Sequence, residues 1–204
     1  MSIARLPLLI ACVGFAAAID VRAEPTGASA ACDAVGGNFL ANCGFETGDP
    51  PTGWSGFGTL SRDTTAPHSG AASLRVVSQV FVNDQALANA NSNCFRLVPG
   101  RSYSYGGWAR LLSNTAATAC GAFVVVFADS ACTEQFTTAD STGVAFAGPS
   151  SWQAFGRTFS SPFARSGFLQ ASCDGGGVDD SFTAGFDDLF FVAAVDGIFG
   201  NGFE

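Results

Sequence analysis

Residues 102–111 read Ser-Tyr-Ser-Tyr-Gly-Gly-Trp-Ala-Arg-Leu, and this stretch decides the fold class. Side chains of a β-strand alternate between its two faces, so every second residue shares a side. One face of the predicted strand is therefore apolar and consists of Tyr103, Tyr105, Ala109 and Leu111. The other face carries Ser104, Trp108 and Arg110. A strand with one apolar face is typical of an antiparallel sheet that packs on a core and meets water on its far side.

Short runs of β-branched and aromatic residues extend this pattern in both directions. They lie at 76–77, 81–82, 123–127, 155–159, 168–171 and 189–195, and clusters of Gly, Pro, Ser, Asn and Asp separate them. No convincing helical periodicity intervenes, so the sequence predicts an all-β protein, a single antiparallel β-sandwich. The 20 phenylalanines supply core material. We expect the core to include Phe123, Phe127, Phe186, Phe190 and Phe191.

Length and charge exclude several classes of protein. The chain has 204 residues, which is room for one domain. Its nine basic residues are all arginine and face 17 acidic ones, which gives a formal net charge of −8. A nucleic-acid-binding protein normally has the opposite balance, because it must neutralise phosphates. The single histidine, His68, excludes metal sites that need several imidazoles.

The N-terminus resembles an export signal. Residues 6–19 form an apolar run behind one arginine, and the small side chains of Val21 and Ala23 favour cleavage after Ala23. Cys12 follows a lipobox-like Leu-Ile-Ala, but the apolar run before it is short, so cleavage at 23 is the preferred interpretation. We therefore expect a signal peptide (1–23), an N-terminal segment (24–37) and a sandwich domain (38–195). No later stretch is long and apolar enough to span a membrane.

Removal of the signal leaves an even number of cysteines: Cys32, Cys43, Cys94, Cys120, Cys132 and Cys173. An even count in an exported protein predicts three disulfides, although the sequence leaves their connectivity open. Spacing favours Cys32 with Cys43 and Cys120 with Cys132, which pairs Cys94 with Cys173 by elimination. No C-x-x-C pair supports a metal site instead.

Several motifs together resemble the carbohydrate-binding modules of the family 4/9/22 type, which are galactose-binding-like jelly rolls. The motifs are NFLANCGFE (38–46), GWS (53–55), HSGAASLRV (68–76), LVPGRSY (97–103), WAR (108–110), Trp152 with Phe155 and Phe159, and FDDLF (186–190). Their order and spacing cover residues 38–193. The resemblance implies a jelly roll, a glycan or polysaccharide as ligand, and a structural calcium ion. The matching calcium ligands are Glu46 and Asp187, with backbone carbonyls of the turn 68–70.

Glycan recognition needs aromatic faces and planar polar groups on an open sheet face. Trp108 and Arg110 share a strand face, and Gln170 is expected on a neighbouring strand, so these three are the predicted ligand-binding residues. Catalysis has little support. His68 has a structural role in its turn, and Asp187 and Asp188 are expected on opposite faces of a strand, where they cannot flank one glycosidic bond.

The sequence thus predicts a secreted bacterial protein, extracellular or periplasmic and monomeric, that binds glycan without catalysing a reaction. The alternative is a structural or adhesive protein of the same fold without a sugar site; a hydrolase is a further, weaker alternative. Residues 196–204 form a tail, DGIFGNGFE, that resembles short tails of proteins secreted by Gram-negative bacteria. Its predicted role is a surface or export determinant.

Overall fold

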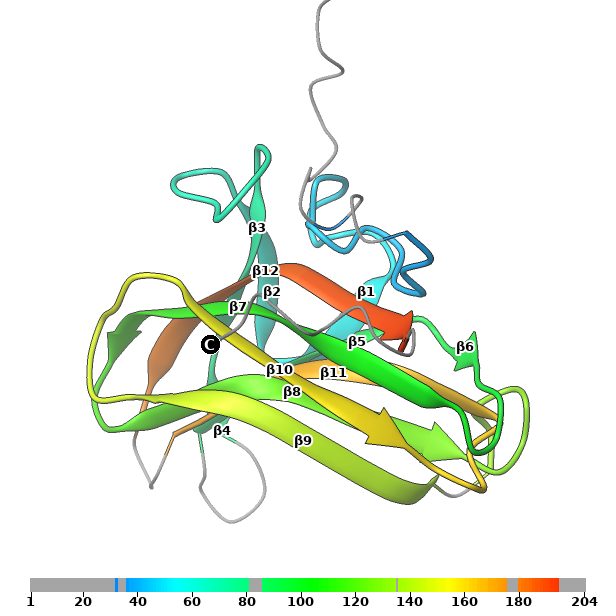
Figure 1. The fold of residues 1–204 in the computed structure, drawn as a ribbon. Coiled ribbons are helices and arrows are strands. Elements are labelled where there is room, and N and C mark those ends of the chain that lie inside the picture. Colours follow the sequence, from blue (N-terminus) through cyan, green and yellow to red (C-terminus); the bar gives the residue numbers. More distant parts are fainter. Residues whose placement is uncertain (1–31, 33–35, 81–85, 135, 176–179, 195–204) are drawn as a thin grey trace, which may run out of the picture.

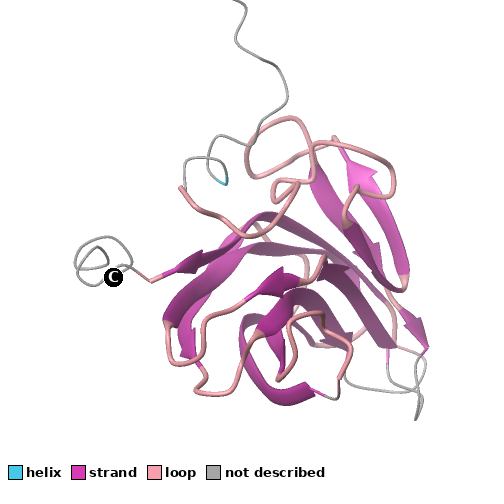
Figure 2. Ribbon diagram, turned by 90° about the vertical axis from the view of Figure 1, so that its right-hand side faces the viewer, coloured by secondary structure: helices cyan, strands magenta, loops and turns pink. Residues whose placement is uncertain are grey.

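The computed structural model describes residue 32 and residues 36–80, 86–134, 136–175 and 180–194. Their twelve strands form two antiparallel sheets that face each other (Figures 1 and 2). The predicted all-β sandwich is therefore confirmed. The signal peptide, the strand expected at 81–82 and the tail at 196–204 lie outside the described residues.

One sheet has seven strands in the order β1-β5-β11-β8-β9, with β4 beside β5 and β6 beside β11. Its members are β1 (Trp54–Phe57), β4 (Gln79–Val80), β5 (Ala86–Ser92), β6 (Phe95–Arg96), β8 (Thr118–Phe127), β9 (Phe136–Phe146) and β11 (Ser166–Gly175). The other sheet has five strands in the order β10-β7-β12-β3-β2. Its members are β2 (Thr59–Asp63), β3 (Ser73–Val77), β7 (Ser102–Asn114), β10 (Gln153–Ser160) and β12 (Phe182–Ala193).

The core combines several alanines of the seven-stranded sheet with large aromatic side chains of the five-stranded sheet. The seven-stranded sheet contributes Ala86, Ala88, Ala90, Ala122 and Ala171, and the five-stranded sheet contributes Tyr103, Tyr105, Phe186 and Phe191, all buried. This complementarity fills the space between two packed sheets at high density. The apolar face predicted for residues 102–111 is confirmed, because all four of its residues are buried in this core.

The hydroxyls of two buried tyrosines form hydrogen bonds at the edges of the core. The hydroxyl of Tyr105 donates to Asp140 of β9 at 3.1 Å. Burial, together with the nearby Asp140 carboxylate, raises the pKa of Tyr105 well above its ordinary value, so the phenol keeps its proton. The Tyr103 hydroxyl accepts the backbone N–H of Val98 at 2.8 Å. Both residues thus bury an aromatic ring without leaving its polar atom unpaired.

Phe123 was expected in the core, and this prediction is wrong, because its side chain is 40% exposed. In the run 123–127 both faces of the strand are apolar, and it is Val124 and Val126 that point inward. Alternation therefore could not distinguish the buried face from the outer one. Phe186 and Phe191 are fully buried and Phe127 nearly so, whereas Phe190 is half-buried.

The predicted cysteines form three disulfides, but two of the pairings differ from those expected. Cys32 pairs with Cys43, as its spacing indicated. Cys120 pairs with Cys173 because these residues face each other on adjacent strands β8 and β11, with Cα atoms 4.1 Å apart. Cys132 pairs with Cys94, which directly precedes β6, the short strand beside β11. Short sequence spacing misled the prediction, because antiparallel pairing brings distant residues together.

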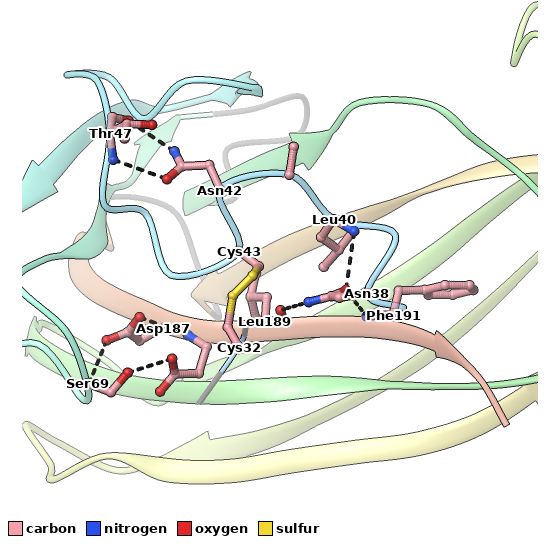
Figure 3. Close-up of a disulfide and its surroundings, with 12 residues drawn as sticks. Cys32, Asn38, Leu40, Asn42, Cys43, Thr47, Ser69, Asp187, Leu189 and Phe191 are labelled. Carbon is pink, nitrogen blue, oxygen red and sulfur yellow. Dashed lines mark hydrogen bonds between the residues drawn. A yellow bond between two sulfur atoms is a disulfide. The ribbon is translucent and has the colours of Figure 1, made fainter. Parts of the chain in front are cut away.

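The segment before β1 is fastened to the last strand. The Asn38 amide donates to the Leu189 carbonyl at 3.1 Å, and its oxygen accepts the Phe191 N–H at 3.0 Å. The Leu189 N–H in turn donates to the Cys43 carbonyl at 3.0 Å. Figure 3 shows the contacts of Asn38 beside the Cys32–Cys43 disulfide. The NFLANCGFE motif thus lies along β12, close to the residues predicted to bind calcium.

Candidate ligand-binding face and metal-binding turn

Gln170 lies in a row of side chains that crosses the outer face of the seven-stranded sheet. Its register partners are Asn91 of β5 and Phe123 of β8, and Ser55 of β1 and Ser141 of β9 continue the row. Gln170 and Asn91 are half-buried, and the other three are exposed. The Gln170 amide donates to the Asn91 side-chain oxygen at 2.8 Å, so the two amides fix each other's orientation.

The row combines the two kinds of group that a neutral, hydroxyl-rich ligand requires. Carboxamides both donate and accept hydrogen bonds, which matches the dual character of a sugar hydroxyl. Phe123 adds an exposed apolar ring beside them.

The adjacent register row contains the pairs Asn89–Ser172 and Ser172–Gly121. The side-chain oxygen of Asn89 accepts the Phe57 N–H at 3.1 Å. Sequence analysis missed Asn91 and Phe123 because neither carries a motif, and their proximity depends on strand order.

Trp108 and Arg110 do not join Gln170. They lie on β7, in the five-stranded sheet, on the side opposite its core residues. Gln170 lies on the outer face of the other sheet, so the whole sandwich separates the two sites. The expectation that β7 and β11 are neighbours was wrong, because β7 pairs with β10 and β12.

The surroundings of Trp108 and Arg110 indicate a structural role. The His68 ring stacks on Trp108, with centroids 3.9 Å apart and planes 19° apart. Arg110 is only 9% exposed, bonds the Asp63 carboxylate at 3.3 Å, and lies over the Trp152 ring at 4.6 Å. One face of Trp108 is thus covered by another side chain, and the Arg110 charge is paired. This arrangement fastens the turn at His68 to the sheet.

Glu46 and Asp187, the predicted calcium ligands, both contact this turn. The Glu46 carboxylate accepts the Ala71 N–H at 3.0 and 3.2 Å. Asp187 accepts the N–H groups of His68 at 2.8 Å and Ser69 at 3.1 Å, and Figure 3 shows it pointing toward Ser69. The fold therefore brings two carboxylates from opposite ends of the sequence to one four-residue turn.

Asp187 is fully buried. Burial raises the pKa of Asp187 to about 7, and the charge of Asp188 acts in the same direction, while hydrogen bonds from the Ser69, Asp188 and His68 amides oppose the rise. A buried carboxylate is costly unless a cation or hydrogen bonds compensate it.

Asp188 also reaches this turn, against expectation. It bonds His68 Nδ1 at 2.7 Å and accepts the Ser69 hydroxyl at 2.7 Å. Consecutive strand residues normally point to opposite faces, but the register between β12 and β7 shifts here and Asp188 adopts a positive φ of 48°. Such a bulge re-aims the side chain, so both carboxylates hold the same turn.

A metal ion at this turn would have to be held by oxygen donors. Within the described residues, no group of three or more His, Cys, Asp and Glu side chains is placed to hold a metal ion. A calcium shell here would therefore combine the carboxylates of Glu46 and Asp187 with backbone carbonyl and water oxygens, donors that calcium accepts.

The sequence matches no family model and no curated protein. Solved structures define the fold, which is that of the β-sandwich carbohydrate-binding modules. One neighbour is TmCBM61 in complex with β-1,4-galactotriose, with 17% identity, a TM-score of 0.51, and coverage of 77% of this chain and 99% of that one. Another is the CBM22-1 xylan-binding domain of Paenibacillus barcinonensis Xyn10C, with 14% identity, a TM-score of 0.52, and coverage of 74% and 93%.

The same sandwich also occurs inside a larger protein. It resembles part of the enzymatically active domain of tailspike protein 4 from bacteriophage CBA120, with 16% identity and a TM-score of 0.54. That match covers 77% of this chain and 21% of the tailspike chain. Identities this low define the fold, and the ligand must be argued from the site. Among the described residues there is also no helix with the length and apolar character that crossing a membrane requires.

Proposed function

We propose that this protein is a secreted, non-catalytic module that binds a glycan or polysaccharide on the outer face of its seven-stranded sheet. The observation that carries the proposal is the row Ser55, Asn91, Gln170, Phe123 and Ser141, which crosses five strands. Its groups are neutral, and they combine oriented carboxamides with an exposed ring. Three disulfides support an extracellular location, since they persist in oxidising compartments.

Affinity gels and a glycan array test this proposal. We expect retention on at least one neutral polysaccharide, and about tenfold weaker binding for Gln170→Ala, because the loss of a buried polar contact costs about 1–2 kcal/mol. Asn91→Ala should behave alike, since the two amides orient each other. Gln153→Ala is the matched control, because this exposed glutamine lies on β10 of the other sheet.

The same assay discriminates the alternative positions and functions. Trp108→Ala reports on the binding position predicted from the sequence; if it abolishes retention while Gln170→Ala does not, the ligand binds the five-stranded sheet and our proposal fails. Absence of retention on every glycan would instead favour a structural or adhesive protein of the same fold.

We further propose that the turn at 68–71 holds a structural calcium ion with Glu46 and Asp187 as carboxylate ligands. The support is their convergence on one turn and the complete burial of Asp187 beside Asp188. A bound divalent cation would compensate this buried negative charge and tie the segment before β1 to the last strand.

A further inference from the structure

Two loops lie side by side at one end of the sandwich, outside the glycan-binding row and the turn at 68–71. The β6–β7 loop (97–101) and the β10–β11 loop (161–165) are joined by two backbone hydrogen bonds. Gly100 N–H donates to the Ser161 carbonyl at 2.8 Å, and Leu97 N–H to the Arg165 carbonyl at 2.9 Å. This is the end of the molecule where β6 lies and β10 terminates (Figure 1).

Each loop presents an exposed apolar side chain at its tip. Phe163 is 66% exposed and Val98 is 56% exposed, the former next to Pro162 and the latter next to Pro99. Both loops are held firmly, because Ser161 Oγ accepts the Phe163 and Ala164 N–H groups at 3.3 Å and the Tyr103 hydroxyl accepts the Val98 N–H. Because the two loops are hydrogen-bonded to each other, these exposed side chains lie on one end of the molecule and form a candidate interaction site.

Exposed arginines accompany these tips. Arg96 ends β6, Arg101 ends the first loop and Arg165 ends the second. In the described part of the chain, Arg62, Arg110 and Arg157 each pair with a carboxylate, but no ion pair involves Arg96, Arg101 or Arg165. Three unpaired positive charges at one end of an acidic protein are a marked local asymmetry.

Two acidic residues, Asp129 and Glu134, offset only part of this charge. They lie on the loop that follows β8, whose last residue, Phe127, accepts the Arg165 N–H at 2.9 Å. The Asp129 carboxylate accepts the N–H and hydroxyl of Thr133, which lower its pKa, so it stays ionised. The three arginines outnumber these two acidic residues.

We propose that this end of the sandwich docks peripherally on an anionic lipid surface. Phe163 and Val98 enter the boundary between headgroups and acyl chains, and the three arginines contact lipid phosphates. Guanidinium groups suit phosphate because they donate paired hydrogen bonds. An acidic polymer in solution would use the arginines but would gain nothing from two protruding apolar tips. The site is separate from the glycan face, so both can be occupied together.

Co-sedimentation with vesicles tests the proposal. The full chain should bind vesicles of phosphatidylcholine and phosphatidylglycerol, should bind pure phosphatidylcholine weakly, and should be released by salt. Arg101→Gln and Arg165→Gln should each weaken binding about fivefold. Phe163→Ser should weaken it about tenfold through lost apolar burial. Arg157→Gln and Phe123→Ser are matched controls, an exposed arginine and an exposed phenylalanine elsewhere, and should bind vesicles normally.

Two outcomes would overturn the proposal. The first is that the wild type fails to bind anionic vesicles. The second is that binding depends on the arginines but not on Phe163, because this result would indicate an acidic polymer as the partner. Glycan retention is measured in parallel: Phe163→Ser should retain it, and Phe123→Ser should reduce it, so failure of this proposal is distinguishable from failure of glycan binding.

Discussion

At the scale of the residue, Asp188 illustrates how one backbone angle changes the chemistry of a site. Its positive φ of 48° turns its carboxylate to the side that Asp187 already occupies. A non-glycine residue in this conformation is uncommon and is retained where surrounding contacts fix it, here those of His68 and Ser69. The result is a concentration of negative charge at one turn, which the alternation rule could not predict.

Calcium dependence is the prediction that belongs to this scale. We expect the melting temperature to be higher in calcium than in chelator, because a ligand that binds only the native state stabilises it by about 2.7 kcal/mol at about a hundredfold excess over its dissociation constant. Glu46→Gln should remove most of this difference, since an amide is a poorer calcium ligand than a carboxylate. Differential scanning calorimetry measures it.

Asp129→Asn is the control for this experiment, because Asp129 lies on the distant loop after β8 and should leave the calcium effect intact. Magnesium at the same concentration should stabilise less, since it requires a stricter octahedral shell. Identical melting temperatures in calcium and chelator would rule out the ion.

At the scale of the element, glycines determine how closely neighbouring strands approach. Gly121 of β8 faces Gly143 of β9, and a Cβ added to Gly121 would lie 2.0 Å from the Thr142 carbonyl oxygen. That contact is with backbone, which cannot rotate away as a side chain does. The two glycines also leave the outer face of the sheet flat beside the Asn91–Gln170 row.

We therefore expect Gly121→Ala to lower the free energy of unfolding by about 1–3 kcal/mol, the usual range for overpacking. Urea denaturation followed by tryptophan fluorescence measures this loss. Gly148→Ala is the matched control, because a Cβ there meets nothing within 4 Å. If the two variants have equal midpoints, the close approach of β8 and β9 is not as described.

At the scale of the whole molecule, two of the disulfides, Cys94–Cys132 and Cys32–Cys43, connect parts that the sheets alone do not. Cys94–Cys132 links residues 38 apart and ties β6 to the loop after β8, whereas Cys32–Cys43 spans only 11 residues. A cross-link restricts the unfolded chain more as the loop that it closes grows. The long-range bridge therefore stabilises the domain more than the short one.

Replacing both cysteines of a pair by alanine tests this order. Loss of Cys94–Cys132 should cost about 4 kcal/mol and loss of Cys32–Cys43 about 3 kcal/mol, both from the loop-entropy relation. Chemical denaturation of the two double variants gives the comparison. A larger loss for the Cys32–Cys43 variant would show that native contacts of the N-terminal segment, and not chain entropy, dominate.

The sequence by itself determined the fold class and the buried face of its central strand, because alternation is a local property of the chain. Tyr103, Tyr105, Ala109 and Leu111 could be assigned to the core from their spacing alone. The cysteine residues that form disulfides could also be identified, since six of the seven remain once the predicted signal segment with Cys12 is set aside.

Only the tertiary structure decided which of these local features meet. Gln170 and Trp108 lie on strands of similar pattern, yet the strand order places them in different sheets, on opposite sides of the molecule. Cys120 pairs with Cys173 rather than with Cys132 for the same reason. Strand neighbours depend on pairing between distant segments, which the packing of both sheets selects together. The periodicity of one strand carries no information about that choice.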